Sequence, residues 1–197
     1  AVLKDAIERS YQKAGWNLRN SESEKGVFPT FFDLLDILPG VIEESHYSKD
    51  TQSDYVGALC TRVKSLTNGI YGSVFCAEDA LSDAELFDCN VVVDLSRVGS
   101  METKSLLMGI LVMKLQEYRM CGSEMNSRLR HVTVLEEAHN LLRKTSAEQS
   151  QEGANLQGKS VEMLANAIAE MRTYGEGFII ADQAPGLLDM SVIRNTN

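Results

Sequence analysis

Three short apolar runs most constrain the fold of this chain. They occupy residues 90–95, 131–136 and 177–182 and read NVVVDL, HVTVLE and GFIIAD. Each is rich in β-branched or other large apolar residues without strict polar alternation, which is typical of strands buried in a parallel sheet. Segments of helical character, residues 100–122 and 159–175, separate the runs. This β-α-β-α-β order predicts an α/β fold in which right-handed crossovers bring about three strands into one parallel sheet.

The first part of the chain has a different pattern, which predicts a mainly helical region. Apolar residues recur at helical spacing in residues 2–14. Two more helices are predicted at residues 31–38, where Pro39 would end the helix, and at about residues 50–67. Glycines punctuate residues 69–75, which predicts turns and a short extended piece.

We therefore divide the chain into a helical insertion or lead-in region, residues 1–85, and an α/β region, residues 86–197. No apolar run approaches the roughly 20 residues that a membrane helix needs. The net charge of −9 argues against a surface that grips nucleic acid over its whole extent, although it leaves room for a local basic strip. The four cysteines form no Cys-x-x-Cys pair, so we expect reduced thiols in a cytoplasmic protein. The sequence begins without methionine, and we expect it to be part of a longer chain.

Polar residues end all three predicted strands. Asp94 ends the first, Glu136 and Glu137 end the second with His139 just beyond, and Gln183 follows the third. Ligands of open parallel sheets bind beyond the carboxyl ends of the strands, so these residues are candidate site residues. Two neighbouring carboxylates repel each other, and a cation usually offsets the repulsion. For Asp94, capping of the next helix is an equally good interpretation.

Residues 153–160 match a second kind of site, the Gly-x-x-x-x-Gly-Lys-Ser phosphate-binding loop. Such a loop follows a strand directly and presents its phosphate to the next helix, whereas the residues upstream of this match carry no apolar β-branched run. We interpret residues 145–158 as a surface loop leading into a helix. The alternative is a permuted nucleotide-binding protein that uses Gly158, Lys159 and Ser160.

The motifs of the α/β region together resemble the second half of the HerA/FtsK-type P-loop ATPase core, including the related conjugation ATPases. The resemblance rests on the blocks EEAHN, AEMRTYG and DQAP in this order and spacing, with CNVVVDLS as the strand before them and SVIRNTN after them. It covers residues 86–197 and implies a partial RecA-like sheet whose phosphate-binding loop lies upstream of residue 1. DEAH-box RNA helicases share the letters EEAH, but their downstream motifs are absent.

The resemblance also implies ATP and Mg²⁺ as cofactors of the full-length parent and assigns roles to individual residues. Glu136 would orient the water shell of Mg²⁺, Glu137 the attacking water, and Gln183 would be a sensor near the γ-phosphate. Arg172 would contact a phosphate, across a subunit boundary in a ring, or would pair with its own helix dipole. Two residues near the same rim are further candidate nucleotide contacts: Asp94 and Arg194.

These motifs predict a fragment of a bacterial or archaeal ring ATPase that couples ATP hydrolysis to the translocation of DNA or protein–DNA complexes. The alternative is a nucleotide-independent interaction module that keeps an ATPase-like shell. We expect the chain alone to bind Mg-ATP weakly or not at all and to be inactive. Without the phosphate-loop strand, residues 177–182 would form an open edge. We expect a second copy, or the N-terminal helices, to cover this edge.

Overall fold

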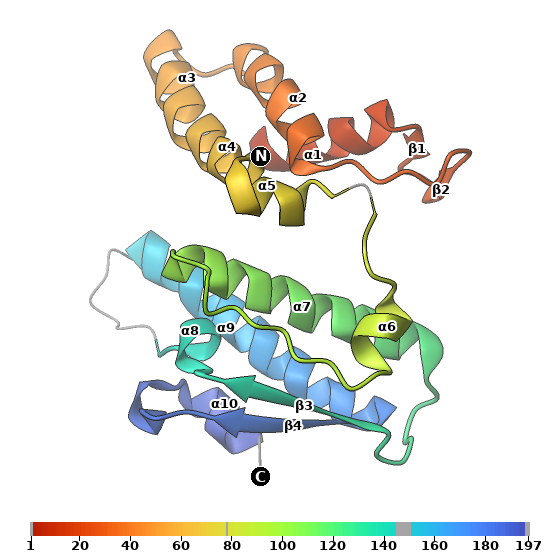
Figure 1. Ribbon diagram of the computed structural model, residues 1–197. Helices are drawn as coiled ribbons and strands as arrows, with labels where there is room; N and C mark the ends of the chain where they lie inside the picture. The colour runs from red at the N-terminus through yellow and green to blue at the C-terminus, as the bar shows by residue number, and fades with distance from the viewer. Residues whose placement is uncertain (1, 78, 145–150, 196–197) are drawn as a thin grey trace. The chain divides into compact units, whose positions relative to one another are not determined.

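The structure is a computed structural model that describes residues 2–77, 79–144 and 151–195 (Figure 1). The chain divides into two compact units, residues 1–80 and 81–197. In the described ranges no helix is both long enough and apolar enough to span a membrane.

The first unit is mainly helical, as its sequence predicts. A two-stranded antiparallel pair, β1 (Trp16–Asn17) and β2 (Glu22–Ser23), follows the first helix. The helical elements are α1 (Val2–Lys13), α2 (Phe31–Glu43), α3 (Lys49–Tyr55), the π-helical turn η1 (Val56–Cys60), α4 (Thr61–Thr67) and α5 (Gly69–Phe75).

Two local predictions in this unit were wrong. Pro39 lies inside α2, which continues to Glu43. Proline removes one backbone donor, but Val41 and Ile42 beyond it are buried in the core of the unit, and this packing holds the last turn in place. The segment at 69–75 is the helix α5 rather than turns, although glycine has a low helix propensity, and its Phe75 ring packs edge-on against Phe31 of α2 with ring centroids 5.4 Å apart.

The second unit is an α/β layer built on one parallel strand pair. β3 (His131–Glu136) pairs with β4 (Glu176–Ala181) in the register His131↔Glu176 to Glu136↔Ala181. The other elements are α6 (Asp83–Phe87), α7 (Met101–Gly122), α8 (His139–Leu142), α9 (Gln151–Met171), the 3₁₀ turns η2 (Arg172–Tyr174) and η3 (Pro185–Leu187), and α10 (Met190–Asn195).

The two long helices of this unit, α7 and α9, pack against the same face of the strand pair. Alternate strand residues point into this layer, with Leu135 buried and Phe178 and Ile180 packed against the same core. The helices supply residues at helical spacing: Met108, Val112, Leu115, Leu164, Ile168 and Met171. The opposite face of the pair stays exposed at Val132, Val134 and Ile179.

The structure shows two of the three predicted strands. Residues 90–95 form no strand, and Val92 in the middle of the run is 93% exposed. A β-branched run predicts a buried strand because such side chains pack well in a sheet that is covered on both faces. In this unit helices cover only one face of the β3–β4 pair, so the sheet does not provide that environment. The run is nevertheless anchored at both ends, since Phe87 is buried and Leu95 packs against the core.

A buried ion pair joins the amino ends of both strands to α7. Arg119 Nε donates to Glu176 Oε2 at 2.8 Å, and the two side chains are 6% and 0% exposed. The second oxygen of Glu176 accepts from Thr133 Oγ1 at 2.7 Å and lies 2.8 Å from His131 Nδ1. The Glu176 carboxylate is therefore fully satisfied although it is out of water, as a buried charge must be.

The same arginine also fixes the segment that follows α6. Its two terminal nitrogens donate to Asp88 Oδ1, at 2.6 Å, and to the backbone carbonyl of Phe87. The pKa of Asp88 is below its ordinary range, first because the Tyr118 hydroxyl donates to it and then because of Arg119. Arg119 thus links α6, α7 and β4 through one guanidinium fork.

We expect Arg119→Met to lower the free energy of unfolding by about 3–5 kcal/mol, because it leaves the buried Glu176 carboxylate without its counterion. Chemical denaturation measures this change. Lys114→Met on the same helix is the matched control, since its 2.9 Å pair with Asp83 is 42% and 41% exposed and such pairs contribute below about 1 kcal/mol. Equal effects of the two substitutions would contradict the structural role of Arg119.

Candidate active site

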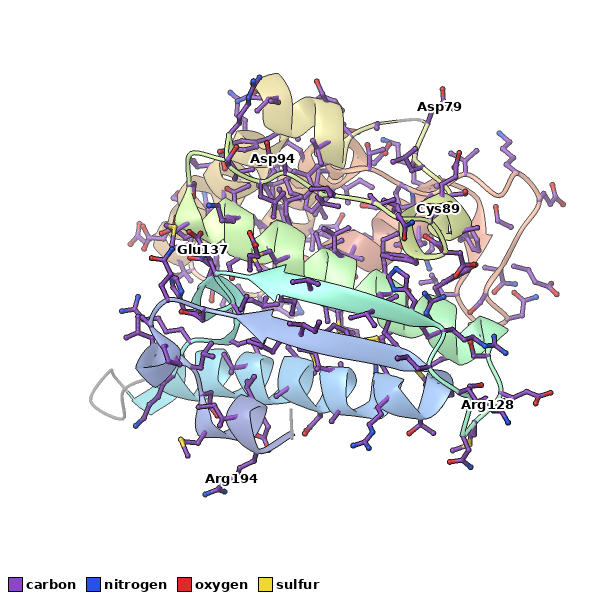
Figure 2. All side chains as sticks on the ribbon, turned by 60° about the horizontal axis from the view of Figure 1, so that its bottom comes forward. Asp79, Cys89, Asp94, Arg128, Glu137 and Arg194 are labelled. Carbon is purple, nitrogen blue, oxygen red and sulfur yellow. The ribbon has the colours of Figure 1, made fainter. Side chains whose placement is uncertain are left out.

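The carboxyl ends of β3 and β4 bring three of the predicted site residues to one edge of the sheet. Because Glu136 pairs in register with Ala181, Glu137 and Gln183 leave the sheet on adjacent strands. Glu136, Glu137 and Gln183 are all exposed at this edge. Figure 2 shows Glu137 at this end of the strand pair and Arg128, before β3, at the other end. The predicted acidic pair and sensor therefore share one surface.

Glu137 has a strained backbone. Its φ of 49° lies in the left-handed region, where a side chain other than glycine costs roughly 1–2 kcal/mol. The Glu137 carbonyl accepts the Asn140 N–H at 2.9 Å, which closes the turn into α8. Strain of this kind persists only where surrounding contacts hold it, and it concentrates at functional sites. The turn presents the carboxylate to solvent, with 56% of the side chain exposed.

Lys104 lies beside one member of the acidic pair, Glu137. It lies in the first turn of α7, which Ser100 caps, and its Nζ is 3.9 Å from Glu137 Oε2. The Lys104 side chain is only 19% exposed. Sequence reasoning did not name Lys104, although a lysine in the helix that follows Asp94 is expected near the carboxyl edge of the sheet.

Asp94 lies on the same side of the unit, close enough to feel the charge of Lys104. The pKa of Asp94 is below its ordinary value, first because the Ser96 N–H donates to Oδ1 at 2.8 Å, then because of the Ser96 hydroxyl, with Lys104 adding a smaller effect. The carboxylate closes a local turn, as a short acidic side chain commonly does. The helix α7 is capped by Ser100, so the alternative interpretation, in which Asp94 caps this helix, is wrong.

A histidine and a buried aspartate tie the two strand ends together. His139 Nδ1 lies 2.9 Å from Asp182 Oδ2, and the His139 backbone N–H donates to the same oxygen at 2.8 Å. The other oxygen of Asp182 accepts the Ala184 N–H at 2.8 Å. The Asp182 side chain is 2% exposed, whereas His139 is 25% exposed. The sequence placed both residues at the strand ends, but their contact depends on the register of β3 and β4.

Two predicted basic residues do not join this group. Arg172 begins η2, which precedes β4, and the neighbouring Thr173 carbonyl accepts the Ser127 N–H at 3.1 Å, so Arg172 lies at the amino edge of the sheet. Arg194 lies in α10, and Figure 2 shows its side chain pointing away from Glu137.

The lysine motif at 153–160 is helical. It lies within α9, which begins at Gln151, so the predicted surface loop is wrong for its second half, while residues 145–150 lie outside the described part of the chain. Inside a helix each backbone N–H bonds to the carbonyl four residues earlier and does not face a phosphate. Gly158, Lys159 and Ser160 therefore form no phosphate cradle, and the permuted-loop alternative is not supported.

The described residues also limit what metal the site could hold. No group of three or more His, Cys, Asp or Glu side chains within the described ranges is arranged to bind a metal ion directly. Mg²⁺, the ion that the resemblance implies, does not require three protein ligands, because it keeps several waters and binds through one or two carboxylates and the phosphates of its nucleotide. Glu136 is the exposed carboxylate that would face such a hydrated ion.

No family model, curated protein or solved structure matches the chain.

We expect Glu137→Gly to raise the free energy of unfolding by up to about 1 kcal/mol, because glycine adopts a left-handed φ without a Cβ clash. Urea denaturation is the measurement. Glu136→Gly is the control, since glycine inside a strand destabilises by about 0.5–1 kcal/mol. If Glu137→Gly destabilises the protein as much as Glu136→Gly does, the left-handed turn is not a source of strain.

We also expect the stabilisation from Asp182 to be lost in acid. The pKa of this carboxyl is below its ordinary value, chiefly because of the Ala184 N–H and then because of His139. Its contribution is therefore complete above the ordinary pKa of about 3.9 and declines as the pH falls through the lower folded-state value.

The measurement is the difference in unfolding free energy between the natural protein and Asp182→Asn as a function of pH. This difference should shrink as the pH falls below about pH 4. Asp79→Asn, at an exposed position, is the control and should give no such difference. A pH-independent difference for Asp182→Asn would contradict the role of the charged carboxylate.

Proposed function

We propose that this chain is part of a HerA/FtsK-like ATPase that couples ATP hydrolysis to the movement of DNA or of protein–DNA complexes. One observation carries the proposal: a parallel strand pair whose adjacent carboxyl ends present Glu136, Glu137 and Gln183 at one edge. Nucleotide hydrolases place their acidic strand end and their sensor at this edge of the sheet.

The chemistry divides among these residues by position. Mg-ATP, when bound, supplies the phosphoanhydride bond and the metal charge that neutralises its phosphates. The exposed Glu136 would accept hydrogen bonds from the water shell of the ion, and Glu137 would orient the attacking water. Gln183, one strand away, would donate a hydrogen bond to a γ-phosphate oxygen. Lys104 places a positive charge next to the Glu137 carboxylate, with its Nζ 3.9 Å from Glu137 Oε2.

In this proposal Arg172 acts on a neighbouring subunit. The six residues of β4 separate it from Gln183 by roughly 17 Å or more, at about 3.3 Å per strand residue. An arginine at the amino edge therefore does not reach a nucleotide at the carboxyl edge of its own subunit. In a ring, the amino edge of one subunit would face the nucleotide of the next, and Arg172 would serve as an arginine finger.

The proposal also includes the third strand and the missing phosphate-binding loop. In Figure 2 Cys89 lies toward the side of Arg128 and Asp94 toward the side of Glu137, which is the direction in which β3 runs. We propose that this run pairs with the free edge of β3 in the assembled enzyme. The phosphate-binding loop would come from elsewhere in a longer chain, and the open β4 edge would pair with that region or with a second copy.

A second candidate function is a nucleotide-independent interaction module with an ATPase-like shell. The exposed apolar side chains of Val132, Val134 and Ile179 on one sheet face favour it, since exposed apolar patches often mark contact surfaces. The two candidates differ in their requirement for nucleotide. Only the ATPase requires a phosphate-binding loop that follows a strand in the longer chain.

We expect isothermal titration of this chain with Mg-ATP to give no micromolar binding, because in the described residues no Gly-x-x-x-x-Gly-Lys-Ser/Thr loop follows a strand. In the longer parent protein, Glu137→Gln should abolish phosphate release while ATP binding is retained. Glu117→Gln, at an exposed position on α7, is the matched control and should leave turnover unchanged. Turnover that survives Glu137→Gln would refute the role of Glu137.

A further inference from the structure

We propose that His139 is a positioning residue that, through Asp182, fixes the turn carrying Glu137 relative to the turn carrying Gln183. The meaning of this coupling for catalysis rests on the proposed ATPase function. The coupling itself is a property of the two turns and can be measured in this chain without nucleotide.

The physical basis is a single carboxylate that receives hydrogen bonds from both turns. Oδ2 of Asp182 accepts the backbone N–H of His139 at 2.8 Å and lies 2.9 Å from its Nδ1. Oδ1 accepts the Ala184 N–H at 2.8 Å. The Asp182 side chain is 2% exposed, so water competes little for these bonds. Charge-assisted hydrogen bonds of this kind are roughly twice as strong as neutral ones.

These bonds restrain the two proposed catalytic residues from both sides. Gln183 lies between Asp182 and Ala184, and the 2.8 Å bond between these two neighbours closes its backbone into a tight turn. Glu137 precedes His139 by two residues, and its carbonyl accepts the Asn140 N–H at 2.9 Å. The anchored amino end of α8 therefore holds Glu137 in its left-handed conformation, with a φ of 49°.

The same geometry distinguishes a positioning role from a chemical one. Asp182 is acceptor-only when ionised, so the Nδ1 of His139 carries the proton and Nε2 is the free nitrogen. An asparagine amide nitrogen lies at the same number of bonds from the backbone as Nδ1, whereas a glutamine amide nitrogen corresponds to Nε2. A positioning role therefore predicts that His139→Asn retains the coupling and that His139→Gln loses it.

The experiment is ¹H–¹⁵N NMR of this chain without nucleotide, applied to the natural protein and to His139→Ala, His139→Asn and His139→Gln. The two signals to follow are the backbone amide of Glu137 and the side-chain amide of Gln183. We expect Ala and Gln to displace both signals and to speed exchange of the residue 139 amide by about tenfold or more. Asn should leave both signals near their natural positions.

Asp182→Asn is the test from the other side of the pair. It should displace the same two signals by at least as much as His139→Ala, because it also weakens the bonds to the backbone N–H groups of His139 and Ala184. The double variant should displace them no further than Asp182→Asn alone, because the bond from the His139 side chain is then already lost. A general loss of stability would lower the melting temperature without this pattern. If His139→Ala does not fold, the Asn and Gln variants decide, since both keep a polar side chain.

Three outcomes overturn the proposal: an unmoved Gln183 signal in His139→Ala, identical spectra for the Asn and Gln variants, or additive displacements in the double variant. The proposed function fails by a separate measurement, namely turnover that survives Glu137→Gln in the longer protein. If the NMR signals show the coupling but turnover survives Glu137→Gln, the structural link between the two turns stands. Only its proposed role in catalysis is then refuted.

Discussion

The second unit depends on the buried carboxylate of Glu176. It begins β4, is inaccessible to solvent, and receives Arg119 from α7 together with the neighbouring strand residues His131 and Thr133. A carboxylate without these partners would cost several kcal/mol to bury. The arrangement therefore fixes the register of the strand pair against α7, and the position of every residue at the far edge of the sheet follows from that register.

A second buried carboxylate, at the carboxyl edge of the sheet, also accepts several hydrogen bonds. Asp182, like Glu176, is a buried acid that accepts donors from the adjoining strand or turn. The two acids differ in what they hold. Glu176 fixes packed secondary structure, whereas Asp182 fixes two turns whose neighbouring side chains, those of Glu137 and Gln183, remain exposed. One edge of the sheet thus carries stability, and the other presents polar groups on a fixed frame.

The sequence predicted much of the second unit because its signals are local. The strand at 131–136 is confirmed as predicted, and the strand predicted at 177–182 lies one residue earlier. The run at 90–95 is also rich in β-branched residues, but it forms no strand and its Val92 is exposed. Residue composition alone therefore did not predict the structure of this run. The sequence did not predict the start of α9, because the first turns of this helix consist mainly of polar residues and glycine and carry no apolar residues at helical spacing.

The sequence by itself determined the α/β pattern, the helical first unit and the polar ends of the strands, because these follow from periodicity and residue type. Only the tertiary structure decided which polar groups meet. It placed Lys104 beside Glu137, joined His139 to Asp182, and moved Arg172 to the opposite edge. These contacts join residues far apart in the chain, and strand register and helix packing, which local sequence does not encode, bring them together.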